Sequence, residues 1–356
     1  MSKKNNRNKT SVFDTLHDEI INSDLPEDEK NRRLSVLLRI SSRNVNLMLV
    51  SATGAGKSST INALFDMSVA KVGVGVDPET KEIVKYDLGN LTIWDTPGLG
   101  DGIEADKSHI NQIVRKLSET DNNGNLLIDL VMVVLDASSK DLAVSYDVIN
   151  KTLIPCLGKD THRILIALNQ SDMAMKGRHW DHEQNAPDPT LTDFLKRKVD
   201  SVKQRVRHAT GVEVEPVYYC AGYTEDNGEQ QPPYNLSKLL YYILMAVPSE
   251  KRLVLVDKLN IQNRNWKSNE TDMDYSKAVS DTFFDSLLSG IGMGAGTGAH
   301  IGGRVLGAPG MIAGGLIGGI IGGLHALAIK PLSKLKAFEK PLEKLNTGKL
   351  SDLLKF

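Results

Sequence analysis

The residues best suited to chemistry occupy positions 51–59, which read Ser-Ala-Thr-Gly-Ala-Gly-Lys-Ser-Ser. An apolar run at 47–50 precedes them and predicts a buried strand, and the residues after them predict a helix. Strand, glycine-containing loop and helix favour phosphate binding, because backbone N–H groups of the loop and of the helix start face one concavity. Lys57 is then placed to reach the outer phosphates of a nucleotide, and the Ser58 hydroxyl to bind Mg²⁺.

The loop departs from the usual phosphate-binding pattern at one position. The pattern G-x-x-x-x-G-K-[ST] has glycine where this chain has Ser51. We expect the serine to strain the turn or to weaken nucleotide affinity. Gly54 and Gly56 leave room for phosphate, since neither has a side chain. The residues expected to contact the nucleotide here are Thr53, Gly54, Ala55, Gly56, Lys57, Ser58 and Ser59.

A second expected strand, 90–95, ends in an acidic residue that is followed by a glycine. Asp95 closes the strand, and Gly98 comes shortly after it. A carboxylate at this point can hold Mg²⁺, often through water, and a flexible glycine N–H can sense the outermost phosphate. The order of these residues after the phosphate-binding loop strengthens the prediction of a nucleotide site.

Two later strands, expected at 162–168 and 215–220, end in residues suited to a purine base. The Asp172 carboxylate can accept two N–H bonds from guanine, from N1 and from the exocyclic amine. Adenine offers neither donor, so it would leave a buried acceptor unpaired. Backbone N–H groups of 220–222 can meet guanine O6. The candidate base-binding residues are Asn169, Gln170, Asp172, Cys220 and Ala221.

Alternating strand and helix signals predict an α/β fold, a mostly parallel sheet with helices on both faces. Ligands bind such sheets at the carboxyl ends of the strands, where these motifs lie. The expected strands are 46–50, 82–87, 90–95, 129–136, 162–168 and 215–220. The expected parts of the chain are a helical N-terminal extension at 1–45, a nucleotide-binding domain at 46–248, a helix and linker at 249–285 with the linker at 266–280, a glycine-rich apolar helical hairpin at 286–329 and a basic amphipathic tail at 330–356.

Taken together, the motifs resemble those of translation-factor-class P-loop GTPases of the Era/TrmE/septin branch. The similarity is greatest to bacterial, often prophage-encoded, Era-like GTPases, through 53–59 and the Trp-Asp-Thr-Pro-Gly-Leu-Gly run at 94–100. The resemblance covers 46–248 and implies a GTP-hydrolysing enzyme whose ligands are GTP or GDP and Mg²⁺. Binding to RNA or the ribosome, as in the Era branch, is not supported by any visible RNA-binding module.

The resemblance also assigns roles to individual residues. Lys57, Thr80 and Gly98 match catalytic positions, and Ser58, Thr80 and Asp95 match the metal ligands. Thr80 is chosen as the threonine of the first switch because it precedes the second strand at a suitable distance. An ordinary turn threonine is the alternative interpretation.

Two further departures from the family pattern bear on activity. Gln170 stands where the family has a lysine whose side chain lies over the base. The glutamine side chain has no charge, but it keeps an aliphatic stem that can cover the base. Leu99 follows Gly98 where Ras-like enzymes carry a glutamine that orients water. An apolar side chain cannot orient water, so we expect slow hydrolysis unless a partner, a second copy or another loop supplies the missing group.

The composition limits the compartment and the partners. The formal net charge is -1, which creates no global field for nucleic acid. Two cysteines, Cys156 and Cys220, fit a reducing compartment, and 1–10 lack the apolar core of a signal peptide. The cysteine content and the polar N-terminus therefore predict a cytoplasmic protein.

His179 and His182 could share a helix face as metal ligands, but a solvated surface insert is the interpretation we favour.

The glycine-rich segment 286–329 is the other unusual stretch. Its glycines recur every four residues on either side of Pro309, a spacing that lets two helices approach closely. Residues 305–329 contain no Asp, Glu, Lys or Arg and are long enough to span a bilayer. One interpretation is attachment to the inner face of the membrane, peripheral or inserted, with lysines of 330–356 on anionic headgroups. A soluble packed helical pair or a flexible segment is the other.

The sequence thus predicts a GTP-binding switch with weak hydrolysis, coupled to membrane association or to homodimerisation across the nucleotide face. One alternative is a membrane-perturbing or scaffold protein with a regulatory nucleotide domain. The other is a GTPase that associates with the ribosome or with RNA.

Overall fold

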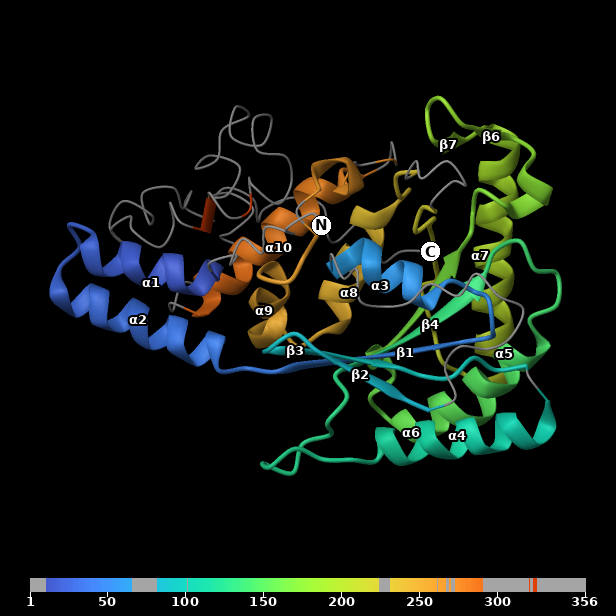
Figure 1. Cartoon of the computed structure of the whole chain (residues 1–356), viewed down its shortest axis with the longest axis horizontal. Coiled ribbons are helices and arrows are strands. Elements are labelled where there is room, and N and C mark those ends of the chain that lie inside the picture. The colour runs from blue at the N-terminus through green and yellow to red at the C-terminus, as the bar shows by residue number, and fades with distance from the viewer. Residues whose placement is uncertain are drawn as a thin grey trace, which may run out of the picture.

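The computed structural model describes residues 11–65, 82–100, 102–223, 231–260, 262–266, 269, 273–290, 320 and 323–324. Its centre is a six-stranded sheet in the order β2-β3-β1-β4-β5-β8 (Figure 1). The strands are β1 (Val45–Ser51), β2 (Val84–Asp87), β3 (Leu91–Asp95), β4 (Leu130–Asp136), β5 (Ile164–Asn169) and β8 (Val217–Tyr218). Because β2 alone runs antiparallel to its neighbour in this sheet, the expected α/β fold with a mostly parallel sheet is confirmed.

The central strand β1 shows why the sheet carries helices on both faces. All of its residues are buried, as expected of a parallel strand that is covered on both sides. Leu47 and Leu49 pack into one hydrophobic cluster, and Met48 and Val50 pack into the other. The alternation follows from the two-residue repeat of a strand, so a continuous apolar run supplies two cores.

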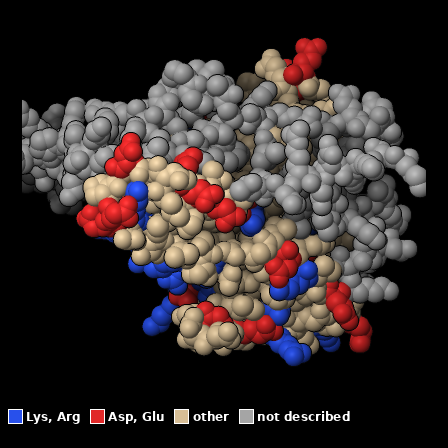
Figure 2. Space-filling view, turned by 60° about the vertical axis from the view of Figure 1, so that its left-hand side comes forward, with Lys and Arg blue, Asp and Glu red and all other residues tan. Residues whose placement is uncertain are grey.

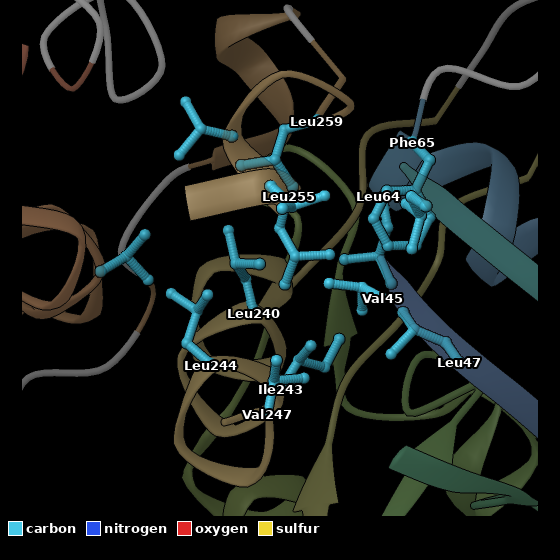
Figure 3. Packing of buried hydrophobic residues seen from close by; sticks show 14 of the residues in the cluster. Val45, Leu47, Leu64, Phe65, Leu240, Ile243, Leu244, Val247, Leu255 and Leu259 are labelled. Carbon is cyan, nitrogen blue, oxygen red and sulfur yellow. The ribbon is translucent and has the colours of Figure 1, made fainter. Parts of the chain in front are cut away.

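Each core is closed by its own helices. The first contains side chains of α3 (Lys57–Phe65), α8 (Leu236–Ala246) and α9 (Arg252–Val256). Figure 3 shows Leu64 and Phe65 packed near Leu255 and Leu259, with Leu240 on the neighbouring helix. The second core contains side chains of α4 (Ile103–Leu117), α5 (Ala143–Val148), α6 (Ile154–Leu157) and α7 (Pro189–Thr210).

The N-terminal helices α1 (Val12–Asn22) and α2 (Glu27–Ser41) form a pair at one side of the sheet (Figure 1). Leu16 and Ile20 of α1 are buried in the first core. The Val12 N–H donates to Asp257 Oδ1 at 2.7 Å, which ties the start of the pair to the residue after α9. In Figure 2, acidic and basic side chains are interspersed on the described part of this side.

Helix α10 (Tyr275–Gly290) begins inside the stretch expected to be a linker, 266–280, and continues past residue 285. It packs against α8, and Phe283 and Phe284 are fully buried. Ile320 and Leu324 of the glycine-rich segment lie in the same core. The rest of the expected hairpin and the tail lie outside the described residues. Within the part of the chain that is described, no helix is both long enough and apolar enough to cross a membrane.

The insert after β5 carries a short antiparallel ribbon, β6 (Trp180–Asp181) with β7 (Ala186–Pro187). The Trp180 ring is buried and meets Tyr234 edge-on, with 5.2 Å between ring centroids. His179 Nδ1 lies 2.8 Å from Asp188 Oδ2, and Asp188 also caps α7 by accepting the N–H of Leu191. Among the described residues, no three His, Cys, Asp or Glu side chains gather in a way that could hold a metal ion.

Candidate nucleotide-binding site

The expected phosphate-binding loop lies between the end of β1 and the first turn of α3. Gly54 and Gly56 adopt φ angles of 79° and 88°, which glycine accepts without steric cost. A Cβ atom on Gly56 would collide with the side-chain amide of Asn169. Asn169 Nδ2 donates to the Ala55 carbonyl at 3.0 Å, and Gln170 Nε2 donates to the Gly54 carbonyl at 2.8 Å. The expected phosphate loop and base loop are therefore in direct contact.

Ser51 enters the site through its side chain. Lys57 Nζ donates to Ser51 Oγ at 2.9 Å, and the same hydroxyl donates to the Ala52 carbonyl at 2.6 Å. Ser51 is buried and is not one of the described non-glycine residues with positive φ. The turn is therefore not strained in the way that the sequence led us to expect, and the serine gives Lys57 an additional partner.

Asp95 ends β3 in register with Leu49 of β1. Its Oδ1 atom is buried and has no hydrogen-bond partner. Burial raises the pKa of the Asp95 carboxyl to about 6, and the Lys57 ammonium opposes that rise. A buried, unpartnered carboxylate oxygen suits Mg²⁺ or a water molecule bound to it. Ser58, at the start of α3, would be the second ligand.

The residues that follow β3 continue its pairing alongside the phosphate loop. The Leu99 N–H donates to the Ser51 carbonyl at 3.0 Å, and the Thr53 N–H donates to the Leu99 carbonyl at 2.9 Å. Leu99 is 2% exposed and packs into the second core. A Cβ atom on Gly98 would collide with Thr53, so the two segments approach as closely as glycine allows. The side chain at the water-orienting position is thus both apolar and buried.

A cavity of about 220 Å³ is lined by all five of the expected base-binding residues. Asp172 lines this cavity, and its buried Oδ1 atom has no hydrogen-bond partner, which fits a guanine that offers two N–H donors. Burial and the nearby Asp172 carboxylate raise the pKa of the Cys220 thiol. The expected residues that line the cavity are Gly56, Ser59, Asn169, Gln170, Asp172, Cys220 and Ala221, and Met173, Gly222 and Tyr223 line it as well.

The expected contact from the 220–222 backbone to guanine O6 is only partly available. The Ala221 N–H donates to Asn169 Oδ1 at 3.0 Å, and the Gly222 N–H lies 3.4 Å from Cys220 Sγ. Ala221 therefore closes the cavity, but in this arrangement its N–H is used within the protein. The prediction did not include the Asn169 bridge, because it joins two loops that are far apart in the sequence.

Three residues near the site carried no signal in the sequence. His109 of α4 places Nδ1 3.1 Å from the Gly98 carbonyl. Thr60 Oγ1 donates to the Gly56 carbonyl at 2.8 Å and lies 2.6 Å from the buried Tyr219 hydroxyl. These residues belong to no motif and support the loops from behind. Thr80, the expected switch threonine, lies outside the described residues.

The part of the chain that forms this site is similar in sequence to known proteins. Residues 46–170 match the model of a family described as 50S ribosome-binding GTPase. YkfA of Escherichia coli K12, an uncharacterised protein, is 26% identical over 156 residues, which are 43% of this chain and 50% of YkfA. The chain thus spans about half the length of that curated relative.

Two solved structures illustrate more distant likeness. Toc33 from Arabidopsis thaliana is 18% identical with a TM-score of 0.39, and the match covers 68% of this chain and 97% of Toc33. Era from Aquifex aeolicus is 17% identical with a TM-score of 0.38, covering 58% of this chain and 57% of that chain. Likeness at this level adds nothing to the fold assignment, which the strand order already provides.

The family match begins in β1 and ends at Gln170, so it includes the phosphate loop and Asp95. The loop conformation and the two unpartnered carboxylate oxygens agree with it. This chain therefore contains a domain of the P-loop GTPase type.

Proposed function

We propose that the chain acts as a GTP-dependent switch with slow intrinsic hydrolysis. The observation that carries this proposal is the position of Leu99, which is buried and hydrogen-bonded on both sides to the phosphate loop. Rapid GTP hydrolysis needs a group that orients the attacking water, and Leu99 offers none. The missing group would come from a partner, from another loop or from a second copy bound across the nucleotide face.

We assign the phosphate and metal chemistry to four residues. Lys57 would neutralise the outer phosphates, with Ser58 and Asp95 holding Mg²⁺ directly or through water. The support is that Lys57 lies close enough to Asp95 to oppose the rise in its pKa, and that one Asp95 oxygen has no partner. Thr80 remains our candidate for the ligand from the first switch.

Guanine selectivity is assigned to Asp172. Asp172 lines the cavity together with Asn169 and Ala221, and its buried Oδ1 atom has no partner. A purine without N–H donors at N1 and C2 would leave this buried acceptor unpaired, at a cost of about 1–3 kcal/mol. The cavity should therefore bind guanine nucleotides and reject adenine nucleotides.

The nucleotide-dependent change would begin at Gly98. This residue lies against Thr53 on one side, and its carbonyl meets His109 of α4 on the other. A γ-phosphate that draws the Gly98 N–H towards it would have to move this turn relative to both neighbours. Residues 98–102 would therefore report the state of the nucleotide to α4.

Calorimetry and single-turnover kinetics test the proposal together. The purified chain should bind GDP and a non-hydrolysable GTP analogue, and it should show no saturable heat with ATP. Single-turnover hydrolysis should be slow in dilute protein, and a rate that rises with protein concentration would identify the second copy as the source of the missing group. Fast hydrolysis at the lowest concentration would contradict the role given to Leu99.

A second candidate is association with the 50S ribosomal subunit, which the description of the matched family favours. Co-sedimentation with purified 50S subunits in the GDP and GTP-analogue states tests it. Binding that depends on the nucleotide would support the role. An absence of binding at low and at moderate salt would remove it.

Membrane association through 286–356 is proposed from the sequence, where 305–329 contain no Asp, Glu, Lys or Arg. Flotation of the full chain with vesicles that contain anionic lipid tests it. If binding persists in Lys57→Ala, a membrane protein with a merely regulatory G domain is favoured. Equal protease sensitivity of 286–329 with GDP and with the GTP analogue would disprove coupling to the nucleotide.

A further inference from the structure

A second cavity, of about 680 Å³, lies at the carboxyl end of β4. Its walls come from the loop between β4 and α5, from α5 itself, from the turn after β5 and from one side of α7. It shares no lining residue with the 220 Å³ cavity that Asp172 lines. Met175 lines the larger cavity, and Met173 lines the smaller one. The two cavities are therefore neighbours that a ligand could occupy independently.

The walls of this cavity are strongly cationic, although the whole chain has a formal net charge of -1. One carboxylate, Asp141, accompanies six cationic side chains. Among the described residues, none of the six lies within ion-pair distance of a carboxylate. The six are Lys140, Lys176, Arg178, Arg197, Lys198 and Arg205.

Other cations of α7 behave differently. Lys203 pairs with Glu215, and Arg207 pairs with Glu213 at 3.0 Å. These residues lie on the same helix as Arg197, Lys198 and Arg205 of the cavity but do not line it. Lys196 of this helix also lies outside the cavity and has no ion pair among the described residues. The cavity is distinguished by six unpaired cations around one concave surface, where the field is strengthened by the protein walls.

Lys198 is held in a fixed position at the wall. Its Nζ donates to the carbonyls of Ala137 and Ser139, both at 2.5 Å. An ammonium group has three N–H donors, so one remains for a ligand. Burial lowers the pKa of Lys198, and Asp136 opposes that change. An anion in the cavity would favour the charged form of this side chain further.

The cavity also has an aromatic side. Tyr146 and Phe194 line it, and the Arg205 guanidinium lies 5.3 Å from the centroid of the Tyr146 ring. The stacking holds one cation in a defined orientation. Arginine side chains held in this way suit phosphate oxygens, which they bind through two parallel N–H bonds.

We infer that this cavity binds a small phosphate-rich anion, of the size of a nucleoside polyphosphate or a short polyphosphate, at a site separate from the GTP site. The inference rests on three observations about one surface. The cavity has the volume of a small-molecule site, its cations come from three segments, and none of them is paired with a described carboxylate.

Calorimetry with sodium tripolyphosphate tests the inference. The full chain is titrated in the presence of excess GDP and Mg²⁺, so that the phosphate-binding loop is already filled. We expect saturable binding of one tripolyphosphate per chain. The double variant Lys140→Glu with Arg197→Glu should weaken this binding at least tenfold, since each lost charge-assisted bond is worth about a tenfold change or more.

Lys196→Glu is the matched control. Lys196 is an exposed lysine of the same helix that does not line the cavity, so this change should alter tripolyphosphate affinity less than twofold. GDP affinity should be unchanged in every variant, which shows that each one is folded. The inference is overturned if the wild-type chain gives no saturable heat, or if the control loses as much affinity as the double variant.

Discussion

Lys57 Nζ donates a hydrogen bond to Ser51 Oγ, 2.9 Å away, within the phosphate-binding loop itself. The usual pattern has glycine at position 51, and glycine has no side chain to accept this bond. The ammonium that should meet the phosphates is therefore already held by the protein. A nucleotide has to compete with that contact, which is worth about 1 kcal/mol for a typical buried hydrogen bond.

Replacing Ser51 with alanine should therefore tighten nucleotide binding. The variant loses the competing contact and keeps the Cβ atom, so we expect GDP affinity to rise about fivefold, which corresponds to about 1 kcal/mol. Calorimetry with GDP measures the change. In a Lys57→Ala background, Ser51→Ala should have no such effect, because the partner is gone. An equal effect in both backgrounds would show that Ser51 acts through the backbone of the loop.

Asp172→Asn should change the base that the site accepts. The buried Asp172 oxygen accepts N–H groups only, whereas an asparagine amide also donates. Xanthine has a carbonyl where guanine has its exocyclic amine. We expect GDP binding to fall at least tenfold, and xanthosine diphosphate to become the better ligand.

Competition of both nucleotides against a fluorescent GDP analogue measures this preference. Asp193→Asn removes the same charge from an exposed position on α7 and should leave the preference for guanine unchanged. If Asp172→Asn bound both nucleotides as the wild-type chain does, the base would lie elsewhere.

The sheet was predictable because its central strands are covered on both faces. The run around Val50 reads as apolar for that reason, and the strand expected at 46–50 is found as β1 with one more residue at each end. The edge strand β8 was predicted too long, as 215–220, because it pairs with β5 through only two registered residues. An edge strand pairs on one side only, so its sequence determines the positions of its ends less strongly than in a central strand.

The strand ends were predictable as site positions, but the contacts among them were not. Gln170 reaches the Gly54 carbonyl, and Leu99 pairs with the backbone of Thr53. Both contacts join segments far apart in the chain, so no local pattern records them. The start of helix α10 was not predicted for a different reason. The stretch 266–280 is polar and was interpreted as a linker, and the buried residues Phe283 and Phe284 of the helix come only after it.

Asp95→Asn should separate stability from magnesium binding. The pKa of the Asp95 carboxyl is raised from 3.8 to about 6, so the native state binds more protons than the unfolded state between these values. Stability therefore falls as pH rises through that window, and the ionised carboxylate opposes folding at neutral pH. In the nucleotide-free chain, the variant should be more stable at pH 7.5, by at most about 3 kcal/mol.

Urea unfolding at several pH values measures the stability difference. It should shrink as the pH falls from about 6 and vanish below 3.8, because Asp95 is then protonated in the native and in the unfolded chain. The same variant should bind GTP with Mg²⁺ more weakly, since an amide is a poorer ligand for Mg²⁺ than a carboxylate. Lower stability at pH 7.5 would show that the Asp95 carboxylate has partners in solution that the structure does not contain.

Leu99→Gln should not produce a fast GTPase, although it supplies the side chain that Ras-like enzymes use. The side chain is 2% exposed, and both backbone groups of Leu99 are bonded to the phosphate loop. A glutamine at this position would be buried in the second core, so we expect a loss of about 1–3 kcal/mol in stability and a single-turnover rate within about threefold of wild type. Leu99→Met, which conserves volume, should change both quantities little. A rate increase of tenfold or more in Leu99→Gln would mean that this segment leaves the core when GTP binds, and the source of slow hydrolysis would then be the missing amide alone.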